Sequence, residues 1–202
     1  IFDVATCHFT VQNVHINGTA SPTGTITAMK FFYVWNWKIE NCLINDTHTG
    51  LDLDWGNDAS VQRTDFLGIS GWAVDMSKCI RVHFVGNHFE SANGIVGSEW
   101  EFSNVVLNEF VNTGMCVSAG LSRGVVIDEN VATGCAVAVK FAGLSTNMQV
   151  LNNHFVNCED GVELNGVNWC DVIGNVIQGS TRAGVWIGSN SYTMKVTDNV
   201  IS

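Results

Sequence analysis

The fold is decided by a stretch in the second half of the chain, Val150-Leu151-Asn152-Asn153-His154-Phe155-Val156-Asn157-Cys158-Glu159-Asp160-Gly161-Val162-Glu163-Leu164. This stretch contains an apolar run, an Asn with an apolar residue two positions later, a short polar turn, and a Gly followed by alternating apolar residues. The same order of features returns between Val172 and Ile187, and it starts again at Val196. A pattern that recurs at so short a spacing predicts a solenoid, in which each unit stacks on its neighbours.

The repeated Asn gives the length of the unit. Successive candidates are separated by 28, 24, 22, 21, 22, 23, 22 and 24 residues. Within each unit, short alternations of apolar and polar residues are separated by Gly, Asn, Ser and Thr, which is typical of strands. Three short strands and three turns per unit predict an all-β parallel β-helix that comprises residues 1–202 as a single domain. The candidates for the repeated Asn are Asn13, Asn41, Asp65, Asn87, Asn108, Asn130, Asn153, Asn175 and Asn199.

Each repeated Asn is expected at a sharp corner of its coil. Asn tolerates left-handed backbone angles, and stacked Asn side chains can bond to one another along the axis as a ladder. The residues two positions later are expected to point inward as one column, which His15 and Ala132 interrupt. Residues 18–27 are expected to form an inserted loop. The predicted inward column consists of Leu43, Leu67, Phe89, Phe110, Phe155, Ile177 and Ile201.

Composition excludes some classes of partner. The formal net charge of −10 argues against binding to a nucleic-acid backbone or to an anionic membrane. Seven cysteines without a Cys-x-x-Cys pair are expected to be reduced and structural. That expectation favours folding in a reducing cytoplasm. Because the sequence starts at Ile1 without Met and ends within a repeat, we expect a piece of a longer protein, with the caps of the solenoid missing.

Several coils resemble a known family. Residues 82–96, 105–117, 125–139, 150–164 and 172–187 resemble right-handed parallel β-helix proteins of the pectin-lyase-like superfamily, most of all bacteriophage tailspikes. The resemblance implies an elongated, right-handed protein that acts on carbohydrate and, in tailspikes, forms a homotrimer on the virion tail after folding in the host cytoplasm. The chain lacks the Asn-x-Asp and Asp-Asp signature of polygalacturonases and the Arg-x-Pro-x-x-Arg motif of pectate lyases. Those two activities are therefore not expected.

The strand after the second turn of each coil carries the candidate catalytic residues. Asp52 lies within an apolar alternation, and Asp75 lies at the corresponding position one coil later. The repeat therefore stacks these two acids about 4.8 Å apart, and Asp54 follows Asp52 on the same face. Carboxylates this close repel, so one has a raised pKa and can act as an acid while another stays ionised, as glycoside hydrolysis requires. The same outward column is expected to continue with Val96, Ala138, Glu163 and Trp186.

Trp55 follows Asp54, and Trp72 precedes Asp75 by three residues. Glu99, Trp100 and Glu101 occupy the turn that corresponds to Trp55 two coils later. A tryptophan ring can cover the apolar face of a sugar, which makes these residues candidates for binding a glycan. The alternative for any one of the acids is a solvated surface side chain. The candidate substrate-binding residues are Trp55, Trp72, Glu99, Trp100 and Glu101.

A second acidic group lies near Trp169 and Trp186, but its Glu-Asp pair falls in a turn, so we expect solvated side chains there. This group consists of Glu159, Asp160, Glu163 and Asp171. The six histidines show no spacing typical of zinc ligands, and no metal or cofactor is expected. Calcium could bind among Asp52, Asp54 and Asp75 if the protein were a lyase.

The sequence thus favours a phage tailspike-like protein that binds and hydrolyses a bacterial surface polysaccharide. Asp52, Asp54 and Asp75 are the candidates for acid, base or nucleophile. Two alternatives stay open, a lyase or epimerase that acts on a uronic-acid glycan and a non-catalytic rod that only binds glycan. The expected location is a virion tail or, failing that, the extracellular space.

Overall fold

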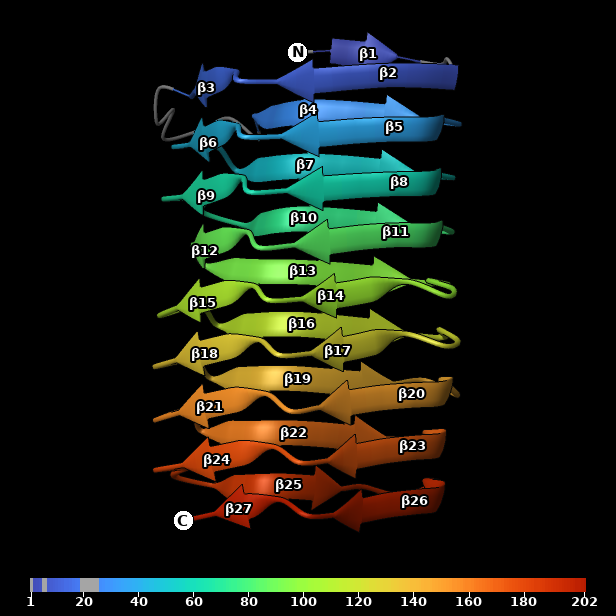
Figure 1. Ribbon diagram of the computed structural model, residues 1–202, viewed down its shortest axis with the longest axis vertical. Helices are drawn as coiled ribbons and strands as arrows, with labels where there is room; N and C mark the ends of the chain where they lie inside the picture. The colour runs from blue at the N-terminus through green and yellow to red at the C-terminus, as the bar shows by residue number, and fades with distance from the viewer. Residues whose placement is uncertain (1, 5–6, 19–25) are drawn as a thin grey trace.

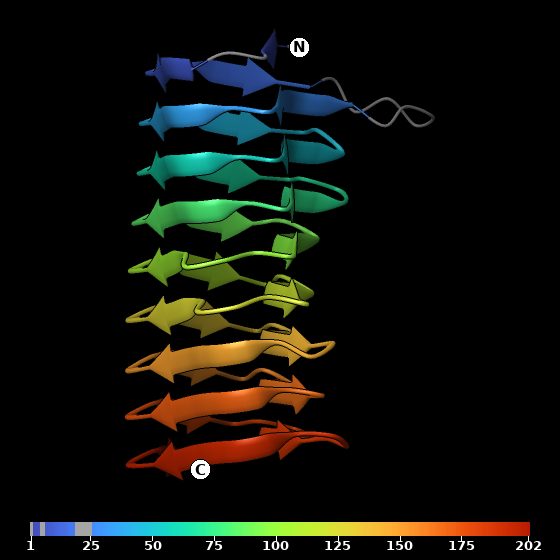
Figure 2. The same cartoon turned by 90° about the vertical axis from the view of Figure 1, so that its right-hand side faces the viewer.

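The computed structural model describes residues 2–4, 7–18 and 26–202, which form a parallel β-helix of stacked coils (Figure 1). Each coil contributes one strand to each of three nine-stranded sheets, here named A, B and C. Figure 2 shows the same stack from the side, with consecutive coils lying one below the other. The predicted all-β solenoid with three strands per coil is therefore confirmed. Most of the predicted loop at residues 18–27 lies outside the described residues.

The strands of each sheet follow one another coil by coil. Sheet A consists of β1 (Phe2–Val4), β4 (Thr27–Phe32), β7 (Thr49–Asp54), β10 (Trp72–Ser77), β13 (Asn93–Ser98), β16 (Met115–Gly120), β19 (Val137–Ala142), β22 (Asp160–Asn165) and β25 (Ala183–Ile187). Sheet B consists of β2 (Cys7–Gln12), β5 (Trp35–Glu40), β8 (Asn57–Gln62), β11 (Ile80–Val85), β14 (Asn104–Val106), β17 (Val126–Asp128), β20 (Thr146–Leu151), β23 (Asn168–Ile173) and β26 (Tyr192–Thr197). Sheet C consists of β3 (His15–Asn17), β6 (Leu43–Asn45), β9 (Asp65–Leu67), β12 (His88–Glu90), β15 (Glu109–Val111), β18 (Val131–Thr133), β21 (His154–Val156), β24 (Val176–Gln178) and β27 (Val200–Ile201). None of the described residues forms a helix long and apolar enough to cross a membrane.

Stacked aromatic rings fill the core beside sheet C. The rings of Phe66, Phe89 and Phe110 lie 4.9 and 4.7 Å apart at interplanar angles of 7°. Because every neighbouring strand pair is in parallel register, identical side chains of consecutive coils meet face to face. Phe89, Phe110, Phe155 and Ile177 of the predicted inward column are buried as predicted, whereas Ile201 on the last strand is 52% exposed.

The first coils differ from the prediction by one position. Ile44 and Phe66 point inward instead of the predicted Leu43 and Leu67. His15 is exposed, and Ile16 packs against the core in its place. The error arises because the residues aligned with the repeated Asn are Cys42 and Thr64, rather than Asn41 and Asp65. A shift of one residue moves a strand side chain to the opposite face.

The predicted ladder of Asn side chains runs from Asn87 to Asn199 between sheets B and C. Asn130 is typical, since its Oδ1 accepts from the backbone N and the Nδ2 of Asn108 at 2.9 and 3.0 Å. The prediction of a left-handed conformation is confirmed for Asn13 (φ 56°) and Asn41 (φ 52°), which lie outside the ladder, and is wrong for each ladder Asn. The left-handed residue precedes it in each coil, as at Leu107 (φ 58°) and Glu129 (φ 52°). The chain turns at the residue before the Asn, so the Asn side chain can point inward.

Six cysteines outside the first strands are free and buried, as predicted for structural thiols. Burial raises the pKa of Cys79 to about 11 and that of Cys170 to about 12. A thiol that does not ionise near neutral pH is a poor nucleophile. Cys79 and Cys170 therefore act as small apolar core residues.

Sheet B has an outward bulge at the same place in every coil. The second residue of each strand, or its equivalent after an isolated bridge, has a positive φ and drops out of the strand register. Such a bulge directs the side chain away from the core. This bulge column consists of His8, Asn36, Asp58, Arg81, Phe102, Gly124, Asn147, Trp169 and Thr193.

Candidate functional site

Sheet A brings Asp52 and Asp75 together. They are register partners on the adjacent strands β7 and β10, and Asp54 is paired with Ser77 at the end of the same strands. Both acids face outward because the residues that flank them along the strands are buried. Adjacent strands lie about 4.8 Å apart, so the predicted stacking of the two acids is confirmed as a feature of the fold.

A lysine adds a positive charge to this acidic pair. Lys30 of β4 is the register partner of Asp52 on the other side, and its Nζ lies 2.8 Å from Asp52 Oδ2. Sequence reasoning missed Lys30, although the alternation Met29-Lys30-Phe31 carries the signal that identified Asp52. Desolvation raises the pKa of Asp75, the negative charge of Asp52 raises it further, and Lys30 lowers it. Asp75 is therefore the carboxyl that holds a proton more readily.

A groove of about 260 Å³ lies at the corner where sheet A passes into sheet B, next to Asp54. The ring of Trp55 is stacked on Tyr33, with centroids 5.6 Å apart, and Lys78 Nζ lies 4.7 Å from its centroid. Three of the five predicted substrate-binding residues line this groove. The groove is lined by Trp55, Asn57, Lys78, Ile80, Glu99 and Glu101.

The other two predicted substrate-binding tryptophans lie elsewhere. The prediction that Trp100 contacts a glycan is wrong, because Trp100 is 0 % exposed and packs edge-on against Phe84 in the core. Glu99 has a left-handed conformation (φ 52°), which turns the following residue inward between two outward acids. Trp72 is half-buried at the first position of β10, at the opposite end of sheet A from Trp55. Trp55 and Trp72 thus lie on opposite sides of the acidic pair, at the two ends of its strands.

The outward column of sheet A contains Lys140 and not the predicted Ala138. Lys140 pairs in register with Glu163, and their charged groups lie 2.8 Å apart. The inward pair of β19 is Val139 and Phe141, so Lys140 between them points outward, while Ala138 is buried. The run of small apolar residues at 136–139 fits two registers equally well, so the sequence could not distinguish them.

The second acidic group is divided between two sheets. Asp160 and Glu163 lie on sheet A, whereas Asp171 lies on sheet B. The expectation of solvated side chains is wrong for Asp160, which is 0 % exposed and bound by Arg182 through Nε at 2.9 Å and through Nη2. It is also wrong for Glu163, which is buried beside Lys140. Each of these two buried acids is thus paired with a cation from a neighbouring coil.

Metal binding finds no support in the described part of the chain. No group of three or more His, Cys, Asp or Glu side chains there could hold a metal ion, and this includes Asp52, Asp54 and Asp75.

The coil architecture agrees with a known family. A family model described as "Right handed beta helix region" matches residues 31–201. The chain belongs to the right-handed β-helix family. This membership confirms the predicted resemblance to pectin-lyase-like β-helix proteins. No curated protein sequence matches the chain.

Solved structures of other right-handed β-helix proteins share the fold at low sequence identity. The periplasmic alginate epimerase AlgG is 12% identical, with a TM-score of 0.80 over 87% of this chain and 47% of that one. Gene product 12 of bacteriophage phi29, in its pre-mature form, is 12% identical, with a TM-score of 0.79 over 94% and 30%. A protein described as a glycoside hydrolase is 13% identical, with a TM-score of 0.69 over 86% and 38%. The chain spans less than half the length of each.

Proposed function

We propose that this chain is the glycan-acting part of a phage tailspike-like protein, which binds a bacterial surface polysaccharide on sheet A and hydrolyses it within the polymer. The observation that carries the proposal is the register pair of Asp52 and Asp75, with Lys30 bound to Asp52 and the pKa of Asp75 raised. The names of the glycoside hydrolase and of the bacteriophage protein with the same fold support this class of function.

The two acids divide the steps of hydrolysis between them. Asp75, in its protonated form, donates its proton to the glycosidic oxygen as the bond to the anomeric carbon breaks. Asp52 attacks that carbon through a carboxylate oxygen and forms a glycosyl ester. Asp75, now ionised, then takes a proton from a water molecule whose oxygen displaces Asp52. The strand spacing of about 4.8 Å is close to the carboxyl separation of about 5–5.5 Å that accompanies retention of configuration.

Asp54 offers a different geometry. It lies two residues beyond Asp52 on β7, a separation of about 6.6–7 Å, which falls within the range of about 6.5–9.5 Å for inverting enzymes. Trp55 and the corner groove continue from Asp54, so we assign glycan binding to that groove. The configuration of the first product therefore separates a reaction by Asp52 and Asp75 from one that uses Asp54.

The test is oligosaccharide release from a panel of purified bacterial surface polysaccharides. Asp52→Asn and Asp75→Asn should each lower release by about 100-fold or more, while the control Asp65→Asn on sheet C should leave it unchanged. Intact release by both sheet A variants would show that the site is wrong. If the wild type released nothing from a glycan that it binds, the non-catalytic rod would be correct.

Lys30 also suits a second candidate function. A cation next to two carboxylates could neutralise a uronic acid while a base removes the proton next to its carboxyl carbon, as in a lyase or an epimerase. The fold likeness to AlgG supports this candidate. A lyase would give unsaturated products that absorb ultraviolet light. An epimerase would change the composition of uronic acids without shortening the polymer.

The tailspike proposal also includes assembly as a homotrimer on a virion tail. The buried, reduced cysteines fit folding in a reducing host cytoplasm. Sedimentation equilibrium of the purified protein measures the assembly, and a monomer at all concentrations would contradict it.

A further inference from the structure

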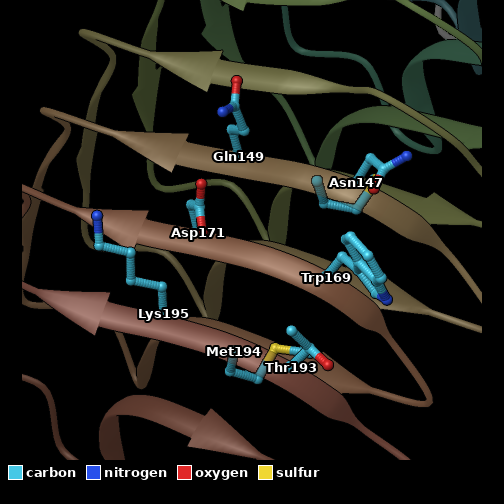
Figure 3. A pocket seen from close by; sticks show the side chains of 8 residues that line it. Asn147, Gln149, Trp169, Asp171, Thr193, Met194 and Lys195 are labelled. Atoms are coloured by element: carbon cyan, nitrogen blue, oxygen red, sulfur yellow. The ribbon is translucent and has the colours of Figure 1, made fainter.

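A second groove lies on the outward face of sheet B, away from the acidic pair on sheet A. It has a volume of about 260 Å³ and lies over strands β20, β23 and β26. Figure 3 shows Trp169 between Asn147 and Thr193, with Gln149, Asp171 and Lys195 in a row alongside. The groove therefore combines one flat aromatic ring with several polar side chains.

The bulge column presents Trp169 to solvent. Its φ of 62° and its place in the bulge direct the indole away from the core, and 64% of the residue is exposed. The neighbours in the column, Asn147 and Thr193, are smaller and leave both sides of the ring open. A bulky residue with positive φ is unusual, and here the bulge repeated in every coil fixes the backbone that carries this ring.

The polar row beside Trp169 has unused bonding capacity. Gln149, Asp171 and Lys195 are register partners on consecutive strands. Across the described residues their side chains form no hydrogen bond or ion pair with one another or with other groups. Elsewhere on sheet B, charged neighbours do pair, as when Arg81 donates to Asp58 at 2.8 Å. The row thus offers an acceptor, a donor and an amide to a ligand.

We propose that this groove is an accessory binding site for a saccharide, with a sugar ring stacked on Trp169. The indole covers the apolar face of the sugar. Asp171 accepts hydrogen bonds from hydroxyls, Lys195 donates to them, and Gln149 can do both. Because one carboxylate and one ammonium group balance each other, the site suits a neutral sugar unit. A few placed polar groups around an aromatic surface are typical of small-ligand sites.

The composition of the groove favours a sugar over a protein partner. The centre of a protein interface is depleted in charged residues, whereas here two charges and two amides surround a single ring. A nucleic acid would need several cations, and this groove has only Lys195 among its lining residues.

The accessory site rests on the proposed function, because it would hold another part of the same polysaccharide. β22, which belongs to the same coil as β23, lies five strands from β7 in sheet A, or about 24 Å along the axis at the usual strand spacing. A polymer held at both places would raise its own local concentration at the acidic pair. Glycan binding at sheet B needs no hydrolysis, so the two ideas can be tested separately.

The experiment uses the catalytically impaired Asp75→Asn protein on an array of purified bacterial O-antigen and capsular polysaccharides, followed by titration with the best binder. Adding Trp169→Ala should weaken binding about tenfold, and Trp169→Phe should restore part of the loss. Phe102→Ala is the matched control, because Phe102 is another exposed aromatic residue of the bulge column. It should leave the affinity unchanged. Bound glycan should also protect the Asp75→Asn protein from quenching of tryptophan fluorescence by acrylamide, and this protection should be smaller when Trp169→Ala is added.

Three results would overturn the accessory site. The first is that no polysaccharide on the array binds, and the second is that Trp169→Ala and Phe102→Ala have equal affinities. The third is a change of oligomeric state in Trp169→Ala without a change in affinity, which would make the groove a contact between copies of the chain. Binding that depends on Trp169 without hydrolysis by the wild type would support this site and contradict the proposed catalysis.

Discussion

Removal of one ladder side chain, Asn130→Ala, should destabilise the protein strongly. The buried Asn130 side chain accepts from the backbone N of Asn108 and donates to the backbone oxygens of Val105 and Asp128 at 2.8 and 3.0 Å. It also donates to Asn153 at 3.0 Å. Alanine leaves the amide of Asn108 without its partner, and an unsatisfied buried group costs about 1–3 kcal/mol. With the other lost bonds, we expect unfolding free energy to fall by about 2–4 kcal/mol.

Equilibrium urea denaturation, monitored by far-ultraviolet circular dichroism, measures this loss. The midpoint concentration of urea should fall, while the dependence of the unfolding free energy on urea should stay unchanged. Asn199→Ala removes the same bonds at the partly exposed end of the ladder, where water can replace them, and should cost about 1 kcal/mol. Asn165→Ala, an exposed control on sheet A, should stay within about 0.5 kcal/mol of the wild type. Equal losses for Asn130→Ala and Asn165→Ala would refute the role given to the ladder.

Three further predictions follow from the charges and rings. Trp100→Ala should cost about 3–5 kcal/mol of stability, measured by thermal unfolding, without direct loss of a glycan contact. Trp55→Ala should instead lower glycan affinity about tenfold, measured by titration. Arg182→Ala should cost about 3–5 kcal/mol by leaving the Asp160 carboxylate unpaired, and an equal loss in an Asp160→Asn background would argue against this cause. The pKa of Asp75 is raised above 3.8 in the folded chain, so the folded chain binds the Asp75 proton more tightly than the unfolded chain does. The free energy of unfolding therefore falls as the pH rises from 3.8 through the raised pKa. Asp75→Asn should therefore be more stable than the wild type at neutral pH and equal to it below about pH 3, as denaturation at several pH values would show.

The regular coils could be predicted from sequence because their chemistry repeats. From Asn87 onward, the ladder Asn recurs in every coil and an apolar residue follows it two positions later, so the ladder and the inward direction of Phe89 and Phe110 follow directly. In the first coils, Cys42 and Thr64 replace the Asn, while Asn41 and Asp65 stand one residue away. Alignment on Asn41 and Asp65 then assigns the following strand residues to the wrong face of the sheet. Only the hydrogen-bond partners distinguish these positions from the neighbouring Cys42 and Thr64.

The candidate site was predictable in its strands but not in its corners. Asp52 and Asp75 lie in clear apolar alternations, which fix their direction. Trp100 lies in a turn, where the left-handed angle of Glu99 decides which side chain points inward, and the local sequence does not reveal that angle. Asp160 is similar, because its burial depends on Arg182 from the next coil.

The bulge column has a consequence for engineering. Its members include a histidine, an arginine, a phenylalanine, a glycine and a tryptophan, all at the same backbone position of successive coils. The scaffold thus accepts side chains of any size or charge there without a change in its core. Repeating one chosen side chain along the column would give a straight row of identical groups about 4.8 Å apart. Such a row could serve as a molecular template for ordering dyes, metal-binding groups or mineral surfaces.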